Sequence, residues 1–170
     1  QISSGEFREG TKVIRGIKAG DALLFESSQL PENSDEHIIQ KARHEFKAML
    51  NKAKIPLNSN FQVEYSHHYG IRNFRDTGAM LINIINREYC KKLILQLPGQ
   101  SLPPHFHKLK DETFNVLYGE LEVEIDGLKR TLYPGEQELI QPGVWHSFRT
   151  STGVIFEELS TTHFNDDSFY

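Results

Sequence analysis

From residue 61 onward, the chain consists of short segments in which apolar residues alternate with polar ones. Gly, Pro, Asn and Asp residues separate these segments at intervals of about eight to twelve residues. A period of two places successive side chains on opposite faces of a strand. The alternation predicts strands at residues 63–65, 79–85, 91–97, 113–118, 121–125, 128–132, 137–140, 147–150 and 154–159. Many short strands joined by tight turns are typical of an all-β barrel or sandwich.

A helical period precedes these strands. Residues 34–54 carry apolar side chains three or four positions apart, at Ile38, Ile39, Ala42, Phe46, Met49, Leu50 and Ala53. This spacing predicts an amphipathic helix with one face on an apolar surface. Asn33, with Glu36 three residues later, is the candidate N-cap, and Pro56 ends the helix.

Length and composition favour a single globular domain. The chain has 170 residues, of which 38% are apolar and 25% charged. Residues 31–170 are predicted to form this domain, with the helix at its start. Residues 1–30 are predicted to be a lead-in with short strands at 13–14 and 22–25. The chain opens at Gln1 and not at Met, so either a tag was removed or the chain is a domain of a longer protein, in which case this lead-in is the tail of a preceding module.

Charge and cysteine content exclude several classes of protein. The net charge is −4, and Lys and Arg are scattered among acidic residues, so no basic surface for nucleic acid is expected. No apolar run reaches the roughly 18 residues that cross a bilayer, so no membrane partner is expected. Cys90 is the single cysteine, which excludes an internal disulfide and fits a reducing compartment. We therefore predict a cytoplasmic protein.

Four residues form the candidate site: His105, His107, Glu112 and His146. On a strand, positions i and i+2 point to the same face, so the two histidines of His-x-His enter one cavity together. Three imidazoles and a carboxylate suit one divalent transition ion: Mn, Zn, Fe, Ni or Co. An octahedral ion with four protein ligands keeps two positions open for a chelating small molecule. The pattern predicts a metal-dependent small-molecule site.

The glycines and prolines around these ligands add specificity. The sequence reads G-x5-H-x-H-x4-E-x6-G from Gly99 to Gly119, and then G-x6-P-G-x2-H from Gly135 to His146. This pair of motifs resembles the cupin superfamily. The resemblance implies a jelly-roll barrel in which the four ligands converge, here with an N-terminal amphipathic helix.

A closer resemblance covers about residues 61–170. The chain is similar to the D-lyxose ketol-isomerase family and to the cupin domain at the C-terminal end of some sialic-acid-synthase-type proteins. The segments that carry the similarity are His68-Tyr69-Gly70, Gly78-Ala79, residues 86–92, residues 97–100, residues 110–114 and residues 158–162.

The isomerase resemblance implies an enzyme that interconverts an aldose and a ketose, with Mn or Zn the favoured ion. It implies that Lys110 and Glu158 are catalytic. Glu158 is then the general base, and Lys110 is the electrostatic or acid partner. Because Glu157 and Glu158 are adjacent on a predicted strand, only one of them can face the interior.

Two other functions remain open at this point. The first is a non-catalytic sugar-binding or regulatory module of a sialic-acid-synthase-like protein. The second is an iron-dependent cupin dioxygenase, which uses the same ligands and needs no Lys/Glu pair. The expected partner is a small sugar or sugar acid, and pairing through sheet edges predicts a homodimer. The aromatic residues of segment 161–170 predict that it packs on the barrel, as a lid or a subunit contact.

Overall fold

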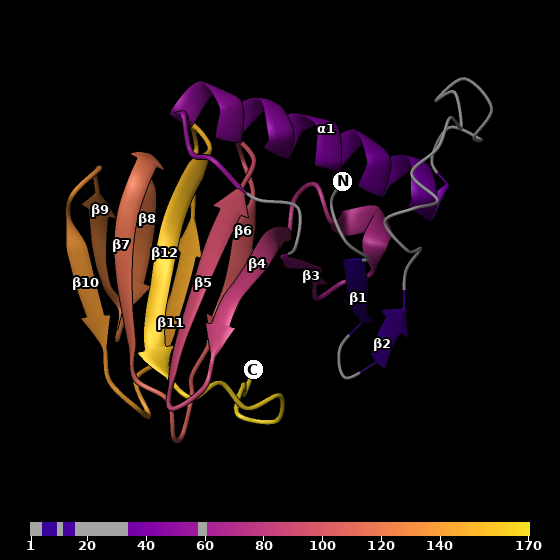
Figure 1. Ribbon diagram of the computed structural model, residues 1–170. Helices are drawn as coiled ribbons and strands as arrows, with labels where there is room; N and C mark the ends of the chain where they lie inside the picture. The colour runs from indigo at the N-terminus through magenta and orange to yellow at the C-terminus, as the bar shows by residue number, and fades with distance from the viewer. Residues whose placement is uncertain (1–4, 10–11, 16–33, 58–60) are drawn as a thin grey trace.

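Twelve strands, one α-helix and a short 3-10 helix make up the described part of the chain (Figure 1). The computed structural model describes residues 5–9, 12–15, 34–57 and 61–170. The helices are α1 (Asp35–Ala53) and η3 (Ile71–Asn73). The strands are β1 (Gly5–Glu9), β2 (Lys12–Arg15), β3 (Gln62–His67), β4 (Gly78–Asn86), β5 (Tyr89–Gln96), β6 (Ser101–His105), β7 (Glu112–Gly119), β8 (Leu121–Ile125), β9 (Leu128–Leu132), β10 (Gln137–Ile140), β11 (His146–Arg149) and β12 (Val154–Thr161).

The strands form two sheets. One has the order β10-β7-β12-β5-β4-β3-β1-β2, and the other has the order β6-β11-β8-β9. Strands that are neighbours in these orders pair antiparallel, with the exception of β1 and β3. A hairpin turn at Asp126-Gly127 joins β8 to β9, and both residues have the positive φ that such a turn requires. This is the predicted all-β jelly-roll barrel.

The interior of the barrel is apolar at its centre. Side chains of both sheets meet there, and they are Ala79, Ile94, Phe114, Val116, Leu121, Val123, Leu132, Ile140, Phe148, Val154 and Phe156. Phe114, Phe148 and Phe156 contact one another, with ring centroids 5.0–5.5 Å apart. The alternation along each strand is the reason that these residues share one face, as the sequence predicted.

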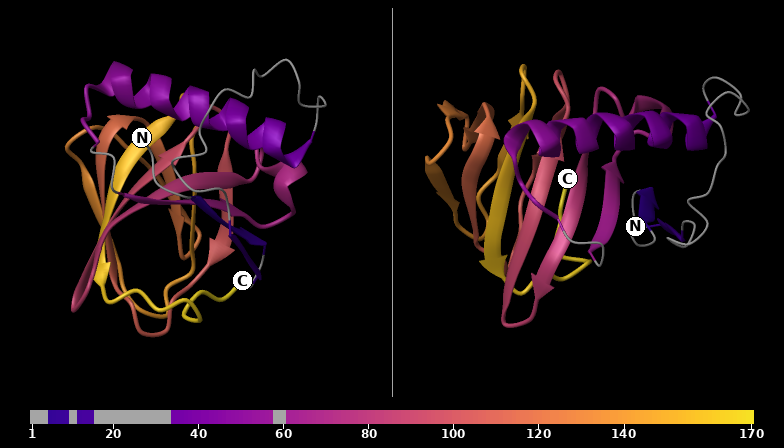
Figure 2. Two further views of the ribbon diagram at one scale, coloured as in Figure 1. Left: turned by 45° about the vertical axis from the view of Figure 1, so that its right-hand side comes forward. Right: turned by 45° about the horizontal axis from the view of Figure 1, so that its top comes forward.

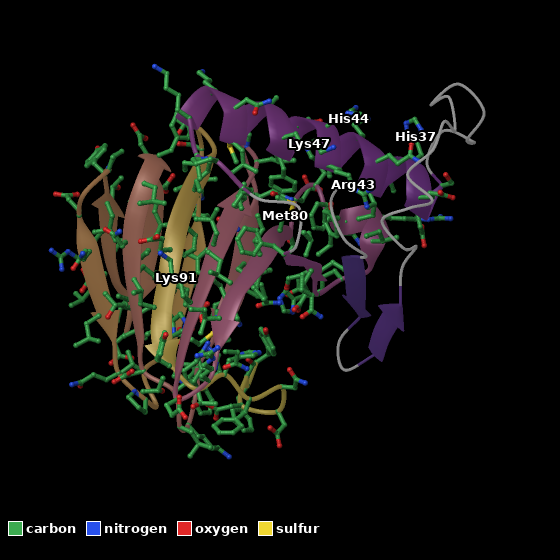
Figure 3. The ribbon with its side chains drawn as sticks, in the orientation of Figure 1. His37, Arg43, His44, Lys47, Met80 and Lys91 are labelled. Carbon is green, nitrogen blue, oxygen red and sulfur yellow. The ribbon has the colours of Figure 1, made fainter. Side chains whose placement is uncertain are left out.

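The helix covers the outer face of the larger sheet. Phe46 and the other buried residues of α1 pack against Tyr65 of β3, Met80 of β4 and Leu95 of β5. Figure 3 shows Met80 beneath the helix and His44 on the side turned away from the strands. In Figures 1 and 2, α1 lies toward one end of the barrel and residues 162–170 run along the opposite end. No helix among the described residues has the length and apolarity for crossing a membrane.

Several local expectations need correction. Ser34 is the N-cap of α1, because its hydroxyl accepts the His37 N–H at 3.2 Å; Asn33 lies outside the described residues. Residues 5–9 of the expected loose lead-in form β1, which pairs with β3. Strand β6 was not predicted, since its sequence contains two prolines and lacks alternation. The predicted strand at 22–25 lies outside the described residues.

Candidate metal centre

Strand pairing brings the three predicted histidine ligands together. His105 ends β6, and His146 begins β11 directly opposite it. His107 follows two residues later on the same side, so the alternation of an extended chain carries it into the same cavity. All three are buried, and their ligand nitrogens lie within 4.8 Å of one another. The ring centroids of His105 and His146 are 4.1 Å apart.

Each imidazole is held through its Nδ1 atom by a backbone carbonyl. His105 donates to Pro103 O at 2.9 Å, His146 to Val144 O at 3.1 Å, and His107 to Asp167 O. A carbonyl oxygen only accepts, so each Nδ1 carries the proton. In the neutral ring, Nε2 then keeps its lone pair. Carbonyl partners that fix this tautomer are typical of metal-binding histidines.

The fourth predicted ligand, Glu112, faces two of these Nε2 atoms. Its Oε2 lies 3.2 Å from Nε2 of His146, and its Oε1 lies 3.4 Å from Nε2 of His107. Oε2 of Glu112 and Nε2 of His146 are buried and have no hydrogen-bond partner among the residues that the structure describes. Two lone-pair atoms that face each other in a buried site are repulsive unless a cation lies between them. The four residues therefore fit a divalent metal ion.

Electrostatics keep the ligands in the forms that bind metal. Burial lowers the pKa of His105 to about 3, with a smaller contribution from His146, so its imidazole is neutral at neutral pH. Burial alone would raise the pKa of Glu112. The positive charge of Lys110 is the largest effect that opposes burial, and it holds that pKa well below its usual range. Glu112 is thus a carboxylate.

The two predicted catalytic residues lie together beside this cluster. Glu158, on β12, faces the interior of the barrel, and its Oε1 accepts from Nζ of Lys110 at 2.9 Å. Lys110 precedes β7, and its Nζ also contacts Oε1 of Glu112. Burial lowers the pKa of Lys110, but Glu158 and Glu112 raise it more, so the pKa is above its usual value. An ammonium group therefore links the metal-ligand carboxylate to the candidate base.

Glu157, the residue before Glu158, points away from the interior of the barrel. Glu157 lies on the outer face of the sheet, where it pairs with Lys91 at 2.6 Å and accepts from Asn115 at 3.0 Å. Of the two adjacent glutamates, Glu158 alone can reach a ligand in the barrel.

Two buried residues at the site were missed by sequence reasoning. Nζ of Lys92 lies 3.8 Å from Oε1 of Glu158, so a second ammonium faces the candidate base. The alternation of Cys90, Lys92 and Ile94 on β5 is the signal that places Lys92 on the inner face. Asp167, in the segment after β12, binds the loop between His107 and Glu112. It has no sequence signal, since its partners lie 57 to 60 residues away.

Comparison with known proteins agrees with this geometry. The family model of the cupin domain matches residues 93–159, which include all four metal-ligand candidates. The D-lyxose/D-mannose isomerase of Thermosediminibacter oceani is 30% identical over 129 residues, which are 59% of this chain and 71% of that protein. The chain belongs to the D-lyxose isomerase family of cupins. A second member, the D-lyxose ketol-isomerase of Cohnella laeviribosi, is 28% identical over 72% of this chain and 84% of that protein.

Solved structures show the same fold. The L-ribose isomerase of Acinetobacter sp. DL28, solved with L-ribose, has a TM-score of 0.61 at 15% identity and covers 74% of this chain and 80% of that one. The L-ribose isomerase of Geodermatophilus obscurus has a TM-score of 0.51 at 17% identity, over 55% of this chain and 69% of that one. The predicted cupin barrel and its resemblance to the lyxose isomerases are thus confirmed. The family comprises sugar isomerases, and the three buried histidines can hold a metal ion.

Proposed function

We propose that this protein is a metal-dependent aldose–ketose isomerase of the D-lyxose isomerase type. The observation that carries the proposal is the contact chain from Glu158 through Lys110 to Glu112, which joins a candidate base to the candidate metal ligands. Metal binding alone requires the ligands but not this buried Lys/Glu pair. Membership in a family with two members named lyxose isomerases supports the same reading.

The metal would be held by His105, His107, Glu112 and His146. When bound, a divalent ion supplies Lewis acidity to the carbonyl and the adjacent hydroxyl of an open-chain sugar. The phenylalanine contacts below the histidines exclude water from that side: His146 lies 6.1 Å from Phe114, and His105 lies 6.4 Å from Phe148, centroid to centroid. Exclusion of water strengthens every charge interaction in the site.

The residues of this chain account for both proton transfers. Glu158 takes the proton from the carbon that bears the hydroxyl and returns it to the neighbouring carbonyl carbon. Lys110 donates a proton to the carbonyl oxygen and recovers one from the hydroxyl oxygen, so the net change is an isomerisation. An ammonium group has three N–H donors, and Glu112 and Glu158 use two of them. One donor is left for a sugar oxygen.

The test is isotope exchange in D2O with a panel of pentoses and hexoses that includes lyxose, mannose and ribose. The protein loaded with Mn²⁺ or Zn²⁺ should convert one of them and place deuterium on the carbon next to the carbonyl. The Glu158→Gln variant should lose about 10²–10⁴-fold in kcat, the usual contribution of a general base. Glu157→Gln is the matched control, because Glu157 is the adjacent acid on the outer face, and it should retain the activity.

Other outcomes select other functions. Sugar binding without deuterium exchange would support a non-catalytic module of the sialic-acid-synthase type. Oxygen uptake with Fe²⁺ would support a dioxygenase. Metal analysis of the purified protein identifies the ion, and if the wild type binds no more divalent metal than a His105→Ala variant, the metal-dependent isomerase is excluded.

A further inference from the structure

Residues 162–170 fold back across the candidate metal centre. After β12, the chain runs along the end of the barrel and returns to the His105–His107 segment (Figures 1 and 2). There Phe106 and Phe169 form an antiparallel bridge with two backbone hydrogen bonds of 3.0 Å. Their rings stack with centroids 5.2 Å apart, and Nζ of Lys108 lies 4.1 Å from the centre of the Phe169 ring. The segment is therefore bound to the loop that carries the metal-ligand candidates.

Asp167 is the anchor of this contact. Its carboxylate accepts the backbone N–H groups of Lys108, Leu109 and Lys110 at 2.9–3.2 Å. Asp167 itself is only 4% exposed. Three N–H donors on one buried carboxylate form a charge-assisted cluster, which is stronger than neutral hydrogen bonds. The loop from His107 to Lys110 is thus held by an acid nearly sixty residues later in the chain.

The same residue also contacts a ligand directly. The backbone carbonyl of Asp167 accepts from Nδ1 of His107, and this bond sets the tautomer that leaves Nε2 for the metal. Asp167 therefore fixes two functional groups at once: the ring of His107 and the backbone at Lys110. The carbonyl partners of His105 and His146 are, by contrast, local, each two residues before its histidine.

Tyr170 packs on the histidine cluster. Its ring stacks on His105, with centroids 5.5 Å apart, and contacts His68 at 4.6 Å. Tyr170 is 61% exposed and His105 is buried, so the stacked ring covers His105 on a side that faces solvent.

We infer that Asp167 is a positioning residue for His107 and Lys110, and that Tyr170 forms the solvent-side wall of the sugar pocket. The second half rests on the proposed isomerase function, whereas the first requires only metal binding. A phenol at this wall offers an apolar face to sugar C–H groups and a hydroxyl to sugar oxygens.

Metal binding tests the role of Asp167 without any sugar. We expect Asp167→Asn to raise the dissociation constant for Mn²⁺ or Co²⁺ by about 10–100-fold, the usual effect of losing a partner that orients a ligand. We also expect it to change the visible absorption spectrum of the Co²⁺-loaded protein. Asp166→Asn is the matched control, since Asp166 is the adjacent, exposed acid. Asp167→Glu keeps the charge and should partly restore both readouts.

Circular dichroism of the metal-free variants separates loss of the fold from loss of positioning. Should Asp167→Asn fold normally and keep the metal affinity and Co²⁺ spectrum of the wild type, the positioning role is overturned. If Asp167→Asn fails to fold, Asp167→Glu is compared with the wild type, because its longer side chain displaces the carboxylate from the three N–H groups. A metal affinity and a Co²⁺ spectrum equal to those of the wild type would then overturn the positioning role.

Tyr170→Leu tests the wall. Water-proton relaxation of the Mn²⁺-loaded protein should rise, because solvent gains access to the ion, and the KM for the converted sugar should rise about threefold to tenfold, as expected for one aromatic contact. The metal affinity should stay near that of the wild type. Tyr133→Leu, at an exposed tyrosine between β9 and β10, is the control. Unchanged water-proton relaxation would show that Tyr170 does not shield the ion from solvent, whether or not a sugar is converted. An unchanged KM would show that Tyr170 does not contact the sugar.

Discussion

At the scale of single residues, the site depends on charges that neutralise one another inside the barrel. Lys110 and Lys92 face Glu158, and Lys110 also contacts Glu112. Four buried ionised groups can coexist only because each has a partner of opposite sign nearby. A bound dication would add further positive charge beside Glu112. The candidate metal ligand Glu112 and the proposed proton-transfer groups are thus a single electrostatic unit.

Lys110→Met should damage both stability and turnover. It leaves two buried carboxylates without their closest cation, so the free energy of unfolding of the metal-free protein should fall by about 3–5 kcal/mol. Urea unfolding measures this, and the proton-transfer role predicts a parallel loss of kcat. Lys91→Met is the control, because Lys91 makes its ion pair with Glu157 on the outer face. The free energy of unfolding of Lys91→Met should fall by less than about 1 kcal/mol. Equal decreases for the two variants would show that Lys110 does not neutralise the buried carboxylates.

At the scale of elements, glycines with positive φ allow two tight turns of the barrel, one at the end of β7 and one between β8 and β9. Gly119 ends β7 with φ +78°, and a Cβ there would lie 1.9 Å from the carbonyl oxygen of Gly153, which precedes β12. Gly127, in the β8–β9 hairpin, has φ +81° with open space around it. The two glycines therefore share the same backbone strain but differ in steric room.

Gly119→Ala should consequently cost more stability than Gly127→Ala. Positive φ alone costs an alanine about 1–2 kcal/mol, which is the full expectation for Gly127→Ala. In Gly119→Ala the new methyl group also clashes with backbone that cannot move without separating β7 from β12. The loss in free energy of unfolding should therefore clearly exceed that of Gly127→Ala. Chemical denaturation of both variants gives the comparison, and similar losses would show that the turn relaxes freely.

The outer face of the same strands predicts a dependence on pH. Burial would raise the pKa of Glu157, but hydrogen bonds from Lys91 and Asn115 outweigh this effect and lower that pKa below its ordinary value of 4.5. The folded pKa is lower than the unfolded one, so the contribution of this carboxylate is present above about pH 4.5 and is lost as pH falls through the folded value. The stability difference between the wild type and Glu157→Gln should be about 0.5–1 kcal/mol at pH 7. It should shrink toward zero in acid, and a difference independent of pH would refute the ion pair.

At the scale of the whole molecule, metal binding should stabilise the fold, because the ligands come from both sheets. His105 and His146 belong to the smaller sheet, and Glu112 belongs to the larger one. An ion that binds only the folded state adds about 2.7 kcal/mol at a hundred times its dissociation constant. Thermal unfolding should therefore shift upward on addition of Mn²⁺ or Zn²⁺ and return with a chelator. His105→Ala should lose most of this shift, and a full shift in the variant would place the ion elsewhere.

The predicted homodimer, the cytoplasmic location and the origin of residues 1–30 stay predictions. Light scattering of the metal-loaded protein decides the first.

The sequence by itself determined the architecture and proposed the ligand set. Alternation of period two set which side chains share a face of each strand, so that only one of Glu157 and Glu158 can enter the barrel, and the family resemblance selected Glu158. The motif spacing selected His105, His107, Glu112 and His146, because glycine turns and a two-residue step are local features of a chain. Helix α1 was predictable for the same reason, to within one residue at each end.

Only the tertiary structure decided how these groups act on one another. The contact of Lys110 with Glu158 joins residues 48 apart, and the bond from His107 to Asp167 joins residues 60 apart. No local period encodes such distances, since they depend on the order of strands in two sheets and on the path of the chain after β12. The sequence therefore predicted a metal site, whereas packing across the barrel placed Lys110, Glu158 and the 162–170 segment around the candidate ligands.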